Sequence, residues 1–195
     1  MESLDPRILI GVLVALAVVV IAFVLMQKRR TDELRTKFGP EYERLVHERG
    51  DARHAESELA HRVDRVKQLQ IKPITPEARS RFAEAWRSDQ ARFVDDPKGA
   101  VVEADRLVAD LMQVRGYPVG DFEQRAADVS VDHPHVVQNY RIAHDIAVRE
   151  QRGEASTEDL RVAMVHYRAL FEDLLDSSES SGEPSNEPEP REAHR

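Results

Sequence analysis

The sequence predicts an all-α protein: an N-terminal transmembrane helix, a charged stalk helix, then a bundle of four main helices with one short extra helix. A run of nineteen uncharged, mostly apolar residues lies at 8–26, and later apolar residues recur at helical spacings of three, four and seven. No segment alternates apolar and polar residues long enough to indicate a sheet. The predicted division is an N-terminal tail (1–7), a transmembrane helix (8–26), charged juxtamembrane and stalk helices (27–72), a helical bundle (73–176) and a disordered acidic tail (177–195).

Composition limits the possible functions. The formal net charge of −8 argues against nucleic acid as a partner, because phosphate binding needs clustered positive charge. The chain contains no cysteine, which excludes disulfides, thiolate catalysis and cysteine-bound metal clusters. A helical anchor and one charge-rich domain are compatible with the 195 residues available.

The apolar run has the length of a membrane-spanning helix. At a rise of about 1.5 Å per residue it extends roughly 28 Å, close to the hydrocarbon thickness of a bilayer. A cleaved signal peptide is the alternative, but Lys28, Arg29 and Arg30 follow the run where a small-residue cleavage site would stand. We therefore predict an uncleaved anchor in contact with membrane lipid.

Basic residues on the two flanks predict the orientation. Arg7 precedes the run, whereas Lys28, Arg29 and Arg30 follow it directly. Because basic flanks stay on the cytoplasmic side, we expect a cell-membrane protein with its N-terminus outside and its soluble domain in the cytoplasm. The alternative is a structural protein of the envelope with its domain outside.

The stalk contains two helix-breaking pairs and one repeating seam. Gly39-Pro40 interrupts the helical pattern, and Gly50-Asp51 is either a second break or a soft spot in one long helix. A coiled-coil seam recurs every seven residues, at Leu45, Ala52, Leu59 and Val66. This seam would either pack within the chain or pair with a second copy.

Helix boundaries in the bundle are marked by capping residues. The expected N-caps are Thr75 and Asp121, and Gly116 is the expected left-handed C-cap. Two further helices are expected to start at Asp96-Pro97 and at Ser156. One further helix is expected to start at Pro134, capped by Asp132 or His133.

Candidate metal ligands occur at this last boundary. Asp132, His133 and His135 place a carboxylate and two imidazoles at a helix start, which is a composition that can bind a metal. We favour capping over metal binding, and the sequence assigns no catalytic, cofactor or metal site. A row of histidines at His47 and every seventh residue after it is too widely spaced for one metal and is expected to face solvent.

A conspicuous group of polar residues lies between Asp121 and Arg141. They could converge on a pocket for an enzyme or a small-ligand or metal-binding protein, or they could form interhelical salt bridges and caps, which we favour. The group comprises Glu123, Arg125, Asp128, Asp132, His133, His135, Asn139 and Arg141.

Three stretches carry a resemblance: FGPEYER at 38–44, RGYP at 115–118 and FEQRAADVSVDHP at 122–134. They resemble an uncharacterised family of bacterial single-pass membrane proteins, usually labelled hypothetical or secreted protein. The resemblance implies no activity. The sequence as a whole favours a membrane-anchored helical interaction or scaffold module, which is not an enzyme and binds a protein partner or a copy of itself.

Overall fold

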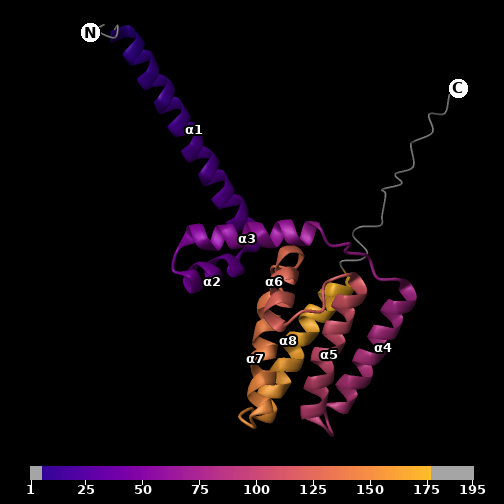
Figure 1. Ribbon diagram of the computed structural model, residues 1–195. Helices are drawn as coiled ribbons and strands as arrows, with labels where there is room; N and C mark the ends of the chain where they lie inside the picture. Colours follow the sequence, from indigo (N-terminus) through magenta and orange to yellow (C-terminus); the bar gives the residue numbers. More distant parts are fainter. Residues whose placement is uncertain (1–5, 177–195) are drawn as a thin grey trace, which may run out of the picture. The chain divides into compact units, whose positions relative to one another are not determined.

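The computed structural model describes residues 6–176, without the side chains of residues 6–10, 12 and 14. Within this range the secondary structure is helical and no strand occurs, so the all-α prediction is confirmed (Figure 1). The predicted tails at 1–5 and 177–195 lie outside the described residues. The helices are α1 (Pro6–Phe38), α2 (Pro40–Arg49), α3 (Ala52–Lys67), α4 (Pro76–Arg92), α5 (Pro97–Arg115), α6 (Phe122–Asp132), α7 (Val137–Gln151) and α8 (Thr157–Asp176).

The chain divides into two compact units, residues 1–61 and 62–195. In the first unit, α1 continues without a break through the predicted anchor and the basic residues to Phe38. Among the described residues, no helix is both long and apolar enough to cross a membrane. The predicted span 8–26 lies partly outside them, because the side chains at 8–10, 12 and 14 are not described.

The stalk folds into two helices instead of one. Gly50 adopts a left-handed conformation with φ +69° and donates its N–H to Val46, which ends α2. The following residue, Asp51, accepts a hydrogen bond from Arg53 N at 3.3 Å and so caps α3. Tyr42 of α2 donates its hydroxyl to Glu56 of α3 at 3.0 Å, which joins the two helices. The Gly50-Asp51 pair is therefore a true break.

This fold uses most of the predicted coiled-coil seam inside one chain. Leu45, Leu59 and Val66 are buried, and so is Ala55, whereas Ala52 is exposed. A seam whose leucines are already covered does not present a continuous apolar stripe to a second copy. His47 and the two histidines that follow it at intervals of seven are exposed, as predicted.

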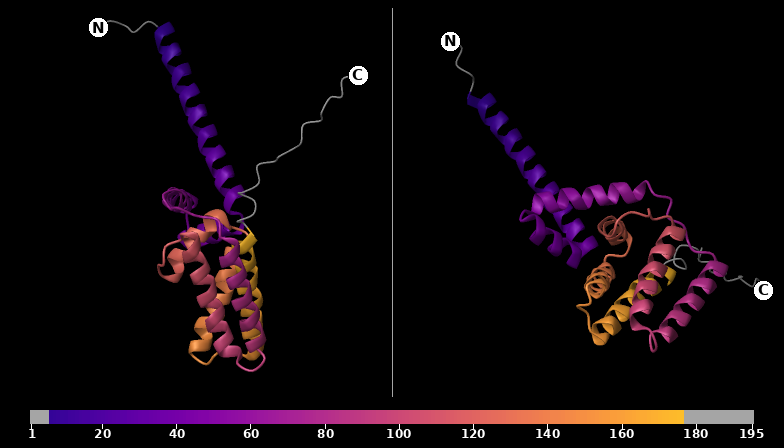
Figure 2. Two further views of the ribbon diagram at one scale, coloured as in Figure 1. Left: turned by 90° about the vertical axis from the view of Figure 1, so that its right-hand side faces the viewer. Right: turned by 60° about the horizontal axis from the view of Figure 1, so that its bottom comes forward.

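In the second unit, α4, α5, α7 and α8 run alongside one another and α6 is short (Figures 1 and 2). Lys98 at the start of α5 pairs with Glu150 near the end of α7. At the opposite end, Arg115 at the end of α5 donates to the Leu174 carbonyl near the end of α8 at 2.9 Å. Thus α5 and α8 run parallel and α7 antiparallel to them. The predicted all-helical bundle is confirmed, and α6 is the shortest of its helices from α4 to α8.

Helix α8 supplies much of the apolar core. Trp86 of α4 stacks on Phe171 of α8 with ring centroids 4.6 Å apart, and Tyr140 of α7 meets Tyr167 edge to face. Burying each such side chain stabilises the fold by about 1.5–3 kcal/mol before entropic costs. The buried apolar residues of α8 are Leu160, Ala163, Met164, Tyr167, Leu170, Phe171, Leu174 and Leu175.

The predicted N-caps Thr75 and Asp121 are confirmed, and so are the predicted helix starts at Asp96-Pro97 and Ser156. Thr75, Asp96 and Asp121 accept hydrogen bonds from the backbone N–H three residues on, at 3.2, 2.9 and 2.8 Å. Ser156 and Asp159 cap each other reciprocally at the start of α8. These residues satisfy backbone donors that a helix leaves without an internal partner.

The predicted helix start at Pro134 is wrong. Helix α6 extends to Asp132, and His133 is its C-cap, donating its backbone N–H to Val129 at 2.8 Å. Residues 133–136 form a turn, and α7 begins at Val137 without a side-chain cap. The Asp132-His133-Pro134 sequence therefore marks the end of α6 and not the start of α7. Pro134 lies in the turn between the two helices.

Candidate functional site

The polar residues between Asp121 and Arg141 separate into several pairs instead of converging on one pocket. Most pairs join two different elements of the bundle, which is the arrangement of interhelical bridges. The contacts are Arg141 to Glu123 at 2.9 Å, Arg125 to Tyr140 at 3.0 Å, Arg65 to Asp128 at 2.6 Å, Tyr117 to Asp132 at 3.0 Å, His166 to Asn139 at 3.0 Å, and both His133 and His135 to Asp173.

The densest group surrounds the end of α8, and we name Arg79, Arg115, His133, His135 and Asp173 the α8 C-terminal cluster. The last turn of a helix exposes carbonyl oxygens that have no internal partner and carries a partial negative charge. Arg115 donates to the carbonyl of Leu174, and Arg79 donates to that of Leu175. Two guanidinium groups therefore satisfy and neutralise this helix end.

His133 lies between an acid and a base in this cluster. Its Nδ1 contacts the Asp173 carboxylate, and its Nε2 lies 3.5 Å from Arg115 Nη1. Only 3% of the residue is exposed, and this burial lowers the pKa of the imidazole, opposed by Asp173. The ring is then neutral at pH 7, and because arginine can only donate, Nε2 accepts while Nδ1–H donates to Asp173.

The three metal candidates are not brought together. His135 is exposed and its Nε2 lies 2.9 Å from the other oxygen of Asp173. Asp132 instead accepts the Tyr117 hydroxyl, and burial, followed by Asp132 itself, raises the pKa of that phenol. Within residues 6–176 no group of three histidine, cysteine, aspartate or glutamate residues is arranged to hold a metal ion.

Sequence reasoning missed three residues of the cluster, Arg79, Arg115 and Asp173. Arg115 continues the apolar stripe of α5 one turn beyond Leu111, and a buried arginine at the end of such a stripe could have indicated a partner helix end. Asp173 carries no such signal, because it lies beside the apolar face of α8 like several exposed acids of that helix. Only the turn at 133–136 brings the two histidines to it.

A groove of about 440 Å³ lies between α5 and α7. His144 stacks on Phe122 with ring centroids 3.6 Å apart, and burial lowers the pKa of its imidazole. Charges of both signs line the groove, so it has no single electrostatic preference. The lining residues are Arg92, Lys98, Gly99, Val101, Val102, Glu103, Asp105, His144, Ala147, Glu150 and Gln151.

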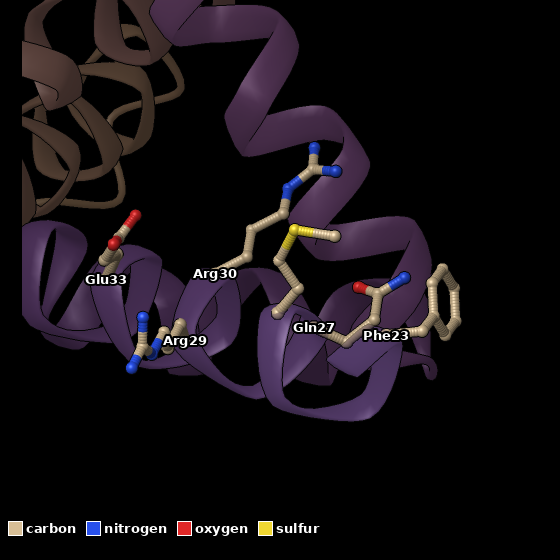
Figure 3. A pocket seen from close by; sticks show the side chains of 6 residues that line it. Phe23, Gln27, Arg29, Arg30 and Glu33 are labelled. Atoms are coloured by element: carbon tan, nitrogen blue, oxygen red, sulfur yellow. The ribbon is translucent and has the colours of Figure 1, made fainter. Parts of the chain in front are cut away.

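A second hollow, of about 410 Å³, lies along α1 (Figure 3). Its lining changes from apolar to charged along the helix, from Phe23 and Met26 through Gln27 to Arg29, Arg30 and Glu33. All its lining residues belong to α1, so it is an open surface and not an enclosed site. The predicted flanking residues Lys28, Arg29 and Arg30 are all exposed here.

Comparison with known proteins supplies no assignment. No family model, no curated protein and no solved structure matches the chain. The resemblance to the uncharacterised bacterial family therefore stays a prediction.

Proposed function

We propose that the protein is a membrane-anchored helical interaction module, with α1 in the bilayer and the bundle as the part that meets a protein partner. One observation carries the proposal. The apolar part of α1 ends at Met26, and Lys28, Arg29 and Arg30 follow on the same helix.

The surface of α1 supports this assignment. The large apolar side chains described between Leu13 and Met26 are 53–66% exposed. An apolar surface of this extent is costly in water and is typical of a membrane or protein contact. Basic side chains directly after it would reach the phosphate groups of anionic lipid.

The bundle supports an interaction role more than a chemical one. Its conspicuous polar side chains are engaged in pairs such as Arg65 with Asp128 and Tyr117 with Asp132, which join helices and turns of the bundle. In such pairs the carboxylates act as acceptors within the fold. We therefore assign them to structure, and we propose a protein partner or a second copy as what the exposed bundle surface binds.

The anchor is tested with charge substitutions in cells. Ala17→Arg combined with Val20→Arg places two charges in the middle of the apolar run, each costing about 2.5–3.5 kcal/mol in a bilayer. We expect the full chain to remain in the membrane fraction after alkaline carbonate extraction and the double variant to be released. Val102→Arg combined with Val165→Arg changes two exposed valines of the bundle and should be retained. Equal retention of both variants would contradict the anchor.

The interaction role is tested by crosslinking the tagged full-length protein in intact cells. A stoichiometric partner, or a crosslinked dimer, should be recovered from solubilised membranes and should disappear when residues 73–176 are deleted. Recovery of the uncrosslinked chain alone would contradict an interaction module.

A further inference from the structure

Asp89 of α4 is a carboxylate without a partner inside the bundle. The residue is 4% exposed, and neither carboxylate oxygen makes a hydrogen bond. Trp86, one turn earlier on α4, is equally buried, and its Nε1–H also makes no hydrogen bond while its ring stacks on Phe171. Buried polar atoms are usually paired, so two unpaired side chains one turn apart mark a weak place in the packing of α4.

The charged groups that act on Asp89 do not compensate its charge. Glu103 of α5 is the strongest of them and opposes ionisation, as does Asp96 in the turn between α4 and α5. Arg92 favours ionisation, but its guanidinium is hydrogen-bonded to Asp96 at 3.1 Å, and Glu103 is held by Arg106. On the side facing α8, this part of α4 contacts an apolar group, the ring of Phe171, which stacks on Trp86.

Burial is the largest cause and, with Glu103, raises the pKa of Asp89 from 3.8 to about 6. The carboxylate is therefore ionised at neutral pH although nothing in the bundle pairs with it, and an unpaired buried charge destabilises the packing around it. Residues 68–75 and 93–96, on the two sides of α4, form neither helix nor strand, so α4 is separated from α3 and α5 by non-helical segments.

We propose that Asp89 makes α4 a pH-controlled element of the bundle. With a proton on Asp89, α4 packs closely on α5 and α8. Loss of the proton loosens α4 and uncovers the apolar surface around Trp86 and Phe171. The use of this surface for a partner rests on the proposed function, whereas the motion itself does not.

The sign and size of the effect follow from linkage. The raised pKa means that protonation stabilises the packed state, and that this stability is lost as pH rises through about 6. With a pKa of 3.8 when α4 is open and about 6 when it is packed, the opening equilibrium should rise about tenfold between pH 5 and pH 7.5.

Hydrogen exchange of the detergent-solubilised full chain measures this opening. After correction for intrinsic rates, protection of the α4 amides should fall about tenfold between pH 5 and pH 7.5, while protection of the α8 amides should not. Asp89→Asn, which cannot ionise, should keep α4 protected at both values. Asp145→Asn removes an exposed carboxylate of α7 and should behave like the parent chain.

Trp86 gives a second readout that needs no variant, because it is the only tryptophan in the chain. Its quenching by acrylamide should increase with pH, with a midpoint near 6. Equal loss of protection in α4 and α8, an unchanged pH response in Asp89→Asn, or pH-independent quenching of Trp86 would each overturn the proposal. None of these measurements depends on membrane retention or on a partner, so failure of the anchor leaves the result readable.

Discussion

His133 shows how one buried side chain links the stability of the bundle to pH. Its Nε2 is 3.5 Å from the guanidinium of Arg115, and its Nδ1 donates to Asp173. Protonation would place a second positive charge beside Arg115 and remove the lone pair that Arg115 uses. The pKa of the folded-state imidazole is lowered, mainly by burial. The stability that His133 contributes is therefore fully present above its unfolded pKa of 6.5 and is lost as pH falls through the lower folded value.

We expect His133→Asn to remove this acid sensitivity. The asparagine amide can still donate to Asp173 but cannot titrate, so the variant should lose about 1 kcal/mol at pH 7.5 and little more at pH 5. As pH falls from 7.5 to 5, the free energy of unfolding, measured by urea titration, should fall more steeply in the parent chain than in the variant. The difference between the two slopes should be at most about 1.4 kcal/mol per pH unit. Subtracting the pH dependence of the variant from that of the parent chain gives the contribution of His133 alone. The contribution of Asp89 is present in both proteins and changes with pH in the opposite direction.

His54→Asn is the control, because that imidazole is exposed and stands outside the bundle unit. It should leave the pH profile of the parent unchanged. A parallel fall in stability for the parent and His133→Asn between pH 7.5 and pH 5 would show that His133 is not the sensitive group.

At the scale of elements, the end of α5 is fixed by contact with the chain that precedes α4. Gly116 has φ +101° and ends the helix, and Lys72 donates its N–H to the Arg115 carbonyl at 2.8 Å. A Cβ atom at position 116 would lie 2.4 Å from the carbonyl oxygen of Gln70. The glycine is thus needed both for its conformation and for the close approach of residues 68–75.

Gly116→Ala should therefore destabilise the bundle more than a Gly→Ala substitution at an ordinary left-handed glycine does. Strain at this φ costs about 1 kcal/mol, and displacement of the Gln70 backbone should bring the loss to about 2–4 kcal/mol. Gly153→Ala is the matched control, because Gly153 has φ +72° with nothing within 4 Å of its would-be Cβ, and it should cost only about 1 kcal/mol. Urea unfolding of both variants decides, and equal losses would contradict the contact with Gln70.

The elements were predicted well where the signal is local. Thr75 and Asp121 cap as expected, and a helix starts at Asp96-Pro97 as expected, because an N-cap acts within four residues of sequence. The start of α7 was predicted at Pro134 and lies at Val137, because the backbone N–H of His133 continues the hydrogen bonding of α6. Proline is favourable at the first position of a helix. It does not determine whether the residues before it belong to the preceding helix or to the following one.

The candidate site was predictable only in part, for a related reason. Sequence indicated His133 and His135 as a pair but grouped them with Asp132, their neighbour in the chain. The structure instead brings Asp173 to both imidazoles. Asp132 belongs to α6, and its carboxylate is directed to Tyr117. Contacts between residues forty positions apart depend on how the helices pack, which no local pattern records.

At the scale of the whole molecule, the proposed anchor predicts on which side of the membrane the N-terminus and the bundle lie. The basic residues Lys28, Arg29 and Arg30 follow the apolar run, and only Arg7 precedes it. The cytoplasmic side retains such basic flanks, so the proposed orientation has the N-terminus outside and the bundle inside. The absence of cysteine makes this directly measurable, because a single introduced cysteine becomes the only thiol in the chain.

We expect Ser3→Cys to react with a membrane-impermeant maleimide in intact cells, and Ser80→Cys, at an exposed position of α4, to react only after permeabilisation. The parent chain should stay unlabelled and controls for other thiols. The reverse pattern would place the bundle outside and favour the structural role in the envelope. Labelling of both positions only after permeabilisation would contradict a spanning helix altogether, because a chain that crosses the membrane once must leave its two ends on different sides.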